Sequence, residues 1–513
     1  MVTSHSFLMP PQDVHNQALV DHVHPTDWVN PKPAAEYDLV VIGAGTAGLV
    51  AAAGAAGLDI GLKVALVERH LMGGDCLNVG CVPSKCLIRS GRAAADMLNP
   101  GPLGVEPVER ANVNFPKVME RMREVRAGIS HHDSAQRFSK IGVDVFLGNG
   151  QFIDGNTIGV GDTRLRFKKV VIATGARATR PPVEGIEEVG FLTNETVFSL
   201  TDRPERLAVI GAGPIGCELA QAFQRLGSNV TLLHRRSYIL NKEDPDAAVL
   251  VQKSLEEDGV KLVTGMTLRR AYRSDRGKVL EFTDAEGQTE SIEVDEILMG
   301  AGRSPNVEGL NLEAVGVQYN QRGVVVDDYL QTTNKRIFAA GDICMAWQFT
   351  HAADAAARIV LKNAFFSPFG LGKSKLSDLT MPWVTFTDPE IARTGLSEEE
   401  AQAKGFDTTT IKIDMSGVDR ALTDGETDGF LKVIHKRGSD EILGATMVSR
   451  HAGETISELT TAIVNKIGLS AMSSVIHPYP TQADCVKRAA DAYRRTLLKP
   501  STKRLLGILT KLS

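Results

Sequence analysis

The same pattern of three glycines occurs twice in this chain, once around residue 45 and again around residue 213. Each time the glycines follow a short apolar segment rich in β-branched residues and precede a segment typical of a helix. Glycines at this spacing allow a tight turn, close approach of the backbone to a phosphate, and close packing of helix on strand. The sequence therefore predicts an α/β fold with two Rossmann-like dinucleotide-binding units. The glycines are Gly43, Gly45 and Gly48 in the first unit and Gly211, Gly213 and Gly216 in the second.

The second strand of each unit ends in different residues. The first ends at Glu68, at the spacing where a carboxylate takes a ribose hydroxyl. The second ends in His234, Arg235 and Arg236. A cationic pair there suits the extra 2′-phosphate of NADP, whereas the alternative is two solvated surface arginines. We therefore predict that Arg235 and Arg236 bind NADPH.

Two cysteines, Cys76 and Cys81, lie shortly after the first unit, in the run 73–85. The residues between them include types that turn sharply enough to bring the two Cβ atoms within disulfide range. Pro83 favours a first helical turn, so Cys81 is expected at a helix N-terminus, where the dipole lowers the pKa of a thiol. The alternatives are structural thiols or half of a metal site, although no second cysteine or histidine pair at zinc-like spacing follows nearby. The pattern favours a redox-active pair.

Composition narrows the class of protein. A length of 513 residues indicates three or four domains at about 150 residues each. The net charge of -5 argues against a nucleic-acid partner. Six cysteines are too few for a fold of this size to depend on disulfide bonds, which indicates a reduced compartment. Because no secretory signal is evident either, we expect a cytoplasmic protein. Residues 39–58 carry no charge but contain five glycines, which indicates a nucleotide fold rather than a membrane span.

Several other segments carry weaker signals. Residues 170–175, ending in Thr174 and Gly175, and residues 336–342, ending in Asp342, are both predicted to return the chain beside the first nucleotide. Beyond about residue 376 the glycine patterns stop, which indicates a separate C-terminal domain.

The two ends of the chain differ from the rest. Residues 1–35 are polar and histidine-containing and are expected to form an extended arm, with metal capture by His22 and His24 as the less favoured alternative. The stretch 487–513 alternates basic residues and leucines. Docking on a neighbouring surface is the favoured use of this stretch, and shallow peripheral contact with a membrane is the alternative.

Taken together, these segments resemble the flavin-dependent pyridine nucleotide-disulfide oxidoreductases over about residues 36–495. The run 73–85, the Gly341-Asp342 element and the segment 385–390 carry the resemblance. It implies two Rossmann-like domains, an α+β interface domain and a homodimer. The implied domains are an N-terminal arm at 1–35, a discontinuous FAD-binding domain at 36–185 and 301–375, an NAD(P)-binding domain at 186–300, a dimerisation domain at 376–495, and a basic amphipathic tail at 496–513.

The resemblance also assigns roles. Cys76 and Cys81 would form the redox disulfide, with Cys81 facing the flavin and Cys76 attacking the substrate. Lys85 and Glu218 match a pair that in the family lies beside the reactive edge of the flavin. Hydride would pass from NADPH to FAD, and electrons from there to the disulfide. The residues assigned to FAD are Gly43, Gly45, Gly48, Glu68, Thr174, Gly175 and Asp342.

One departure from the family pattern bears on the substrate. Disulfide-reducing members have a histidine before the C-terminal Pro-Thr pair, where this chain has Tyr479, with Asp484 at the position of the acid that holds that histidine. A phenol, with a reference pKa of about 10, is a poor proton shuttle near neutrality. His477, two residues before Tyr479, is the less favoured alternative as the proton donor.

Tyrosine at this position is similar to the mercuric reductase branch of the family, as are the segments 348–349 and 420–422. Two thiolates are good ligands for a soft metal ion, so Cys76 and Cys81 are expected to bind Hg(II) or a similar ion transiently as a substrate. That branch also uses a vicinal cysteine pair near the C-terminus, whereas this chain has there only Cys485, for which a buried apolar site is favoured. The remaining alternatives are a disulfide reductase resembling glutathione reductase or dihydrolipoamide dehydrogenase, and a flavin redox sensor of low turnover.

Overall fold

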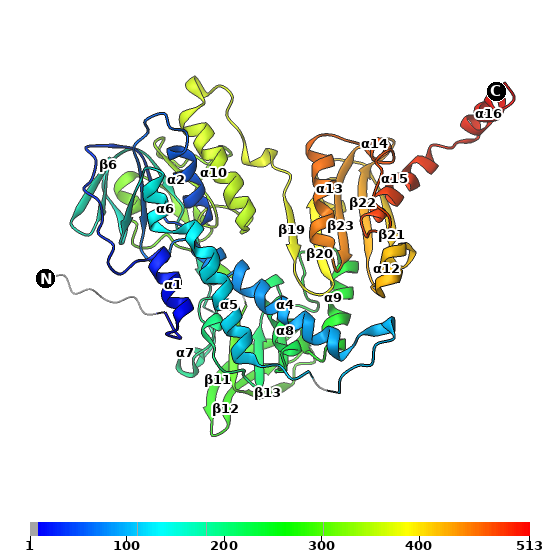
Figure 1. Ribbon diagram of the computed structural model, residues 1–513, viewed down its shortest axis with the longest axis horizontal. Coiled ribbons are helices and arrows are strands. Elements are labelled where there is room, and N and C mark those ends of the chain that lie inside the picture. The colour runs from blue at the N-terminus through cyan, green and yellow to red at the C-terminus, as the bar shows by residue number, and fades with distance from the viewer. Residues whose placement is uncertain (1–8, 110, 181, 301, 513) are drawn as a thin grey trace.

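The computed structural model describes residues 9–109, 111–180, 182–300 and 302–512. The chain forms three lobes and a C-terminal helix that projects away from them (Figure 1). The first glycine pattern belongs to the lobe at the upper left of this view and the second to the lobe at the bottom, while the C-terminal sheet forms the lobe on the right.

A seven-stranded sheet forms the core of the first lobe. Strands β3, β2, β1, β6 and β18 are parallel neighbours in that order, and β5 and β4 continue from β6 as an antiparallel ribbon. Because β6 pairs with β1 and β18 with β6, the predicted return of these segments to the first unit is confirmed. The strands are β1 (Tyr37–Ile42), β2 (Val64–Glu68), β3 (Val143–Leu147), β4 (Gly150–Asp154), β5 (Thr157–Val160), β6 (Thr163–Ile172) and β18 (Ile337–Ala339).

Two helices of small residues, α2 (Thr46–Ala56) and α10 (Thr350–Phe365), pack against each other on this sheet. A Cβ added at Gly54 would lie 2.6 Å from Leu361 Cδ1, so the glycine is needed for this close helix packing. No helix in the described part of the chain is long and apolar enough to span a bilayer, and the charge-free stretch 39–58 instead forms most of β1, the glycine turn and α2.

The second lobe contains a parallel sheet in the order β10-β9-β8-β14 and an antiparallel sheet β11-β12-β13. The predicted second βαβ unit is therefore confirmed, with α8 as its crossover helix. Two long helices, α4 and α5, pack beside this lobe (Figure 1). The elements are β8 (Arg206–Ile210), β9 (Asn229–His234), β10 (Lys261–Thr264), β11 (Thr267–Ser274), β12 (Gly277–Thr283), β13 (Thr289–Val294), β14 (Glu296–Met299), α4 (Cys81–Leu98), α5 (Phe115–Ser130), α8 (Pro214–Arg225) and α9 (Pro245–Glu257).

The third lobe is a five-stranded antiparallel sheet in the order β19-β20-β23-β22-β21, covered by α13 and α15. It begins soon after residue 376, where the texture of the sequence changes. The elements are β19 (Pro382–Thr385), β20 (Glu390–Gly395), β21 (Thr408–Asp414), β22 (Phe430–Lys436), β23 (Ile442–Ser449), α13 (Ala452–Val464) and α15 (Asp484–Thr496).

Asp388 joins this lobe to the helices of the second. Its carboxylate lies 2.8 Å from the Arg225 guanidinium on α8, 3.0 Å from that of Arg450, and 3.6 Å from Arg92 Nε on α4. Burial alone would raise the pKa of Asp388, but the Arg450 hydrogen bonds and the charges of Arg225 and Arg92 hold it at about 2. The carboxylate is therefore charged at neutral pH and bound by three cations from three parts of the chain.

The N-terminal segment differs from its prediction. The expected extended arm instead contains a helix, α1 (Val14–Val23), which packs on α5. Leu19, Val20 and Val23 are buried in the same cluster as residues of the first lobe, because this short apolar face is covered by residues distant in sequence. His5 lies outside the described residues, and His22 and His24 bond different partners, the Ser130 hydroxyl and the His70 carbonyl.

The remaining helices and strands are short, and the last of them, α16, extends beyond the lobes (Figure 1). They are α3 (Gly74–Asn78), α6 (Ala135–Lys140), α7 (Ile186–Val189), α11 (Glu398–Ala403), α12 (Asp419–Asp424), α14 (Leu469–Met472), α16 (Pro500–Leu509), β7 (Ala176–Ala178), β15 (Arg303–Pro305), β16 (Tyr319–Asn320) and β17 (Gly323–Val324).

Candidate active site

The two cysteines of the 73–85 run lie at the junction of two helices. Cys76 is in the short helix α3, and Cys81 is the first residue of α4, so the predicted position of Cys81 at a helix N-terminus is confirmed. A Cβ added at Gly80 would lie 2.7 Å from the Asp75 carbonyl oxygen, so this glycine permits the tight turn between the helices. No disulfide joins the two cysteines in this structure, and their side chains interact and shift each other's pKa.

The two thiols have opposite proton affinities. The hydrogen bond from Cys76 lowers the pKa of Cys81 to about 6 against the effect of burial, and the Thr350 hydroxyl and the Lys85 charge add to it. The same hydrogen bond and burial raise the pKa of Cys76. The Thr350 hydroxyl lies 3.4 Å from Cys81 Sγ. At neutral pH the pair is therefore one thiolate, at Cys81, and one thiol, at Cys76.

A half-buried ion pair adjoins the thiolate. Lys85 Nζ lies 2.8 Å from Glu218 Oε2, which joins α4 to α8. The other Glu218 oxygen accepts a hydrogen bond of 2.8 Å from the backbone N–H of Phe386, and Lys85 Nζ lies 4.4 Å from the centre of the Phe386 ring. The predicted pair is thus formed, and the third lobe helps to fix it.

The first glycine turn forms a cradle at the N-terminus of α2. Gly43 has φ +102°, and a Cβ there would lie 2.3 Å from the Ala173 carbonyl oxygen. Gly45 packs against Gly74, where a Cβ would lie 2.6 Å from the Gly45 Cα. Glu68 closes the cradle: it accepts hydrogen bonds of 2.6 Å from Ala44 N–H and 2.7 Å from His70 N–H. Burial raises the pKa of Glu68, and those donors oppose the rise.

These residues fit the dinucleotide half of FAD. The turn before the helix carries only glycines and one alanine, so a pyrophosphate can approach the N–H groups and the positive end of the helix dipole. The Glu68 carboxylate lies at the strand end where a ribose hydroxyl would be bound.

A second group of charged residues lies where the first lobe meets α3. Arg303 forms an ion pair with Asp75, and its Nε lies 3.4 Å from Asp342 Oδ2. Burial raises the pKa of Asp342 to about 6, although the charge of Arg303 opposes this rise. Arg303 Nε is buried and has no hydrogen-bond partner among the described residues. A buried donor that lacks a hydrogen bond, beside a half-buried carboxylate, is a polar site that can hold a ligand's hydroxyl and phosphate groups.

Thr174 and Gly175 follow β6 close to the glycine turn. The Thr174 hydroxyl donates a hydrogen bond of 2.9 Å to the Asn306 carbonyl, and Gly175 has φ +67°. This hydrogen bond joins the turn to Asn306, the residue directly after β15, and β15 itself begins with Arg303.

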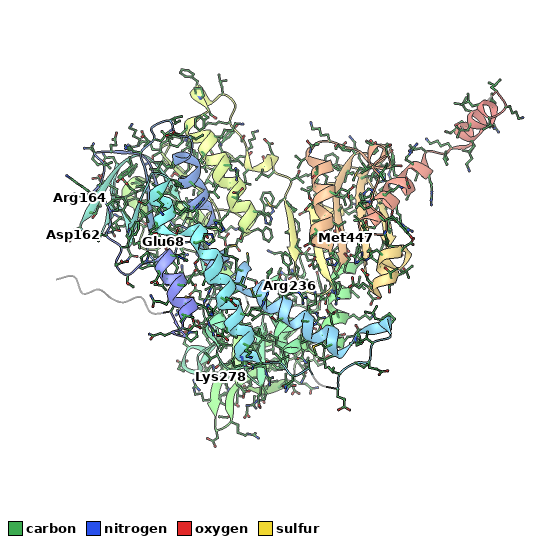
Figure 2. The ribbon with its side chains drawn as sticks, in the orientation of Figure 1. Glu68, Asp162, Arg164, Arg236, Lys278 and Met447 are labelled. Carbon is green, nitrogen blue, oxygen red and sulfur yellow. The ribbon has the colours of Figure 1, made fainter. Side chains whose placement is uncertain are left out.

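The second cradle repeats the first at the N-terminus of α8. Gly211 has φ +106°, and Gly213 is the residue before the helix. Here His234 takes the place of the carboxylate: its Nδ1 accepts a hydrogen bond of 3.2 Å from Ala212 N–H. Arg235 and Arg236 are exposed beyond it and form no ion pair within the described residues (Figure 2). This bare turn with free cations and no carboxylate fits NADP better than NAD.

The C-terminal residues belong to a different lobe from the cysteines. Tyr479 is 75% exposed, and its hydroxyl donates a hydrogen bond of 3.1 Å to Asp419. Asp484 bonds Arg488 instead of holding Tyr479. His477 Nε2 lies 2.9 Å from Glu458 Oε1, with its side chain almost fully buried. Within one chain, therefore, the structure joins Cys76, Cys81, Lys85 and Glu218 but does not bring Tyr479 or Asp484 to them.

Sequence reasoning missed a support behind the cysteine turn. Arg126, only 1% exposed, donates a hydrogen bond of 2.6 Å to the Asn78 carbonyl, between the two cysteines. Its other nitrogen donates to Asn16 Oδ1 at 2.7 Å, so α1 holds this arginine in place. Thr350 and Arg303 were also missed. Each of these two residues is a single polar side chain that reaches the site from a distant segment. A local sequence signal existed only for Arg303, which lies in a Gly-Arg-x-Pro-Asn run.

The other cysteines have structural environments. Cys485 is buried, as predicted, and so are Cys86 and Cys217, while Cys344 is half-buried and donates to the Gly341 carbonyl. Burial raises the pKa of Cys485 to about 12. A thiol with so high a pKa is a poor metal ligand at neutral pH.

Comparisons with known proteins cover nearly the whole chain. The family model described as pyridine nucleotide-disulphide oxidoreductase matches residues 37–357, and the model for the dimerisation domain of that family matches residues 381–490. A mercuric reductase from Staphylococcus aureus is 36% identical over 467 residues, which cover 91% of this chain and 84% of that protein. A dihydrolipoyl dehydrogenase from Geobacillus stearothermophilus is 32% identical over 92% of this chain and 99% of its own length.

A solved structure of a flavoprotein disulfide reductase is also similar to this chain. The Cu(II) complex of the HOCl-induced flavoprotein disulfide reductase RclA from Escherichia coli superimposes with a TM-score of 0.79 and 27% identity, covering 91% of this chain and all of that one.

Proposed function

Because the chain belongs to the pyridine nucleotide-disulphide oxidoreductase family, and is thus a flavoprotein oxidoreductase that uses FAD and NAD(P)H, we propose that it passes electrons from NADPH to Hg(II) or a similar soft metal ion. The supporting observation is the hydrogen-bonded pair of Cys76 thiol and Cys81 thiolate. Two adjacent sulfur atoms bind a soft cation well, and such an ion needs no proton when it is reduced.

The overall reaction balances as a two-electron transfer. NADPH loses a hydride, and Hg(II) gains two electrons, so the products are NADP⁺, a proton and Hg(0). Bound FAD supplies the chemistry that connects a hydride donor to a dithiol. Cys76, Thr350 and Lys85 favour the thiolate form of Cys81. The positive charge of Lys85 would also favour negative charge on a flavin bound next to it.

The predicted site residues other than Tyr479 and Asp484 have the following roles in this proposal. Cys76 is the outer sulfur that meets the substrate, and Arg235 and Arg236 bind the 2′-phosphate of NADPH. Glu68, Asp342, Thr174, Gly175 and the first glycine turn hold FAD, in a domain formed by residues 36–185 and 301–375. Residues 186–300 hold NADPH. The match of residues 381–490 to a dimerisation domain supports a homodimer, and we assign the dimer contacts to residues 376–495.

The C-terminal segment supports a metal ion over a disulfide as the acceptor. A disulfide substrate needs a proton for its leaving thiol, and the residue at the proton-donor position is Tyr479, whose pKa is raised by its hydrogen bond to Asp419. His477 does not replace it, because its side chain is almost fully buried in the third lobe. The mercuric reductases among its relatives, and the Cu(II) complex of a structural neighbour, agree with this choice.

A disulfide reductase is the second candidate, and the similarity to dihydrolipoyl dehydrogenases favours it. The decisive test measures NADPH oxidation by the purified flavoprotein with Hg²⁺ in excess thiol, with glutathione disulfide, and with lipoamide. We expect turnover with Hg²⁺ at least tenfold above that with either disulfide. Turnover with disulfides alone would reject the metal proposal, and negligible turnover with all three would favour a redox sensor.

Substitution of the outer sulfur tests the mechanism. Cys76→Ser is expected to retain FAD and its reduction by NADPH but to lose turnover of Hg²⁺. Cys344→Ser is the matched control, because Cys344 is a half-buried cysteine whose hydrogen bond to a carbonyl a serine can keep. Equal activity in the two variants would contradict the role of Cys76.

A further inference from the structure

The last helix, α16 (Pro500–Leu509), projects away from the three lobes (Figure 1). None of its residues is buried, and it lies beyond residue 490, where the match to the family ends. A ten-residue helix is only marginally stable in water by itself. Its helical form therefore calls for a surface that covers it.

The helix has one apolar and one basic face. Leu505, Ile508 and Leu509 follow the i, i+3, i+4 spacing of a single helix face and are 57%, 56% and 51% exposed. At 100° per residue, Lys503 lies on the opposite side and Arg504 flanks the apolar face. Leu512 and Lys511 continue the two patterns just beyond the helix.

The charge of this segment has one sign. From residue 492 to the end the sequence has six cations and no acidic residue. Lys499, Lys503, Arg504 and Lys511 form no ion pair within the described part of the chain. A narrow aliphatic face flanked by unpaired cations is complementary to a surface with anionic headgroups over an apolar layer, and it has no acidic residue to oppose binding there.

We propose that residues 497–512 dock on an anionic phospholipid surface, with α16 lying flat, its leucines in the headgroup and acyl boundary and its lysines and arginines among the phosphates. This proposal concerns where the enzyme is held and does not depend on which electron acceptor it uses. It makes the protein a peripheral membrane enzyme.

The experiment uses the full-length protein loaded with FAD and sedimented with vesicles of equal parts phosphatidylglycerol and phosphatidylcholine, or of phosphatidylcholine alone. The wild type is expected to bind the anionic vesicles and to be released at 1 M salt, where charges are screened beyond about 3 Å. Lys503→Glu with Arg504→Glu removes basic charge, and Leu505→Gln with Leu509→Gln removes apolar contact. Each pair is expected to weaken binding by about tenfold or more while NADPH oxidation stays unchanged.

Lys117→Glu with Lys261→Glu is the control, because it makes the same change of charge at exposed positions elsewhere and is expected to bind like the wild type. Equal binding by wild type and both tail variants would overturn the proposal. So would an absence of vesicle binding combined with a change of oligomeric state in the leucine variant, which would assign the tail to a second copy of the chain.

Discussion

The two glycine turns have nearly the same backbone but differ at the residue that closes them. Gly43 and Gly211 have φ values of +102° and +106°. A Cβ at Gly48 would lie 1.8 Å from the Gly43 carbonyl oxygen, and a Cβ at Gly216 would lie 1.8 Å from that of Gly211. The steric requirement for glycine is therefore equal in both.

The closing residue differs in charge. The backbone N–H at the second position of the turn donates to the Glu68 carboxylate in the first unit and to His234 Nδ1 in the second. Because Nδ1 accepts this bond, the histidine is neutral with its proton on Nε2. Glycines therefore set the shape of each nucleotide turn, and we propose that the residues at the end of the neighbouring strand select the nucleotide. Glu68 and Arg236, which follow the two strands, are labelled in Figure 2.

The largest effects are expected from the third glycine of each turn. Gly48→Ala should give protein that retains no flavin, whereas Gly216→Ala should retain flavin but lose NADPH binding, because a methyl group displaces a carbonyl in each case. Flavin absorbance and NADPH titration measure these outcomes. Gly128→Ala, in open space on α5, is the control and should change neither. Loss of flavin from both turn variants would break the division of roles.

The next effect concerns the exposed arginines after β9. Arg235→Glu with Arg236→Ala should lower kcat/KM for NADPH by about 100-fold, since a charge-assisted hydrogen bond contributes about 1.5–3 kcal/mol, and should change kcat/KM for NADH little. Steady-state kinetics with both nucleotides measure it. Arg269→Ala, another exposed arginine of this lobe, is the control. An equal loss with both nucleotides would contradict the 2′-phosphate assignment.

His234→Glu converts the closing residue of the second turn to that of the first. The carboxylate can take the Ala212 N–H and a ribose hydroxyl but repels a 2′-phosphate. We expect kcat/KM to rise for NADH and fall for NADPH, by about tenfold each. The ratio of the two values is the measurement, and an unchanged ratio would place nucleotide selection elsewhere.

The smallest effect is a pH dependence of stability. Burial, Arg236 and Arg235 lower the pKa of His234, so the folded state favours the neutral ring. The stability from this group is fully present above its unfolded pKa of about 6.5 and is lost as the pH falls through the lower folded value. His234→Gln, whose side chain does not titrate, should remove this part of the pH dependence of stability in thermal unfolding. A variant as pH-sensitive as the wild type would exclude His234 as the source.

Most of the fold could be predicted from local sequence patterns. The glycine turns, their strands and the helix start at Cys81 were predictable because each depends on residues a few positions apart. The N-terminal helix was not, because α1 is only ten residues long and is held by contacts such as that between Asn16 and Arg126, 110 positions away. For the same reason Thr350 and Arg303 could not be placed beside Cys81 and Asp342 from sequence alone.

The support behind the cysteine turn sets a minimum length for the enzyme. A chain shortened to begin at residue 37, where the family match starts, would lack Asn16 and leave the charged end of Arg126 in the interior with one acceptor fewer. The carbonyl of Asn78 would then depend on a less firmly held donor. Any trimmed version made for crystals or for immobilisation should therefore keep the N-terminal helix.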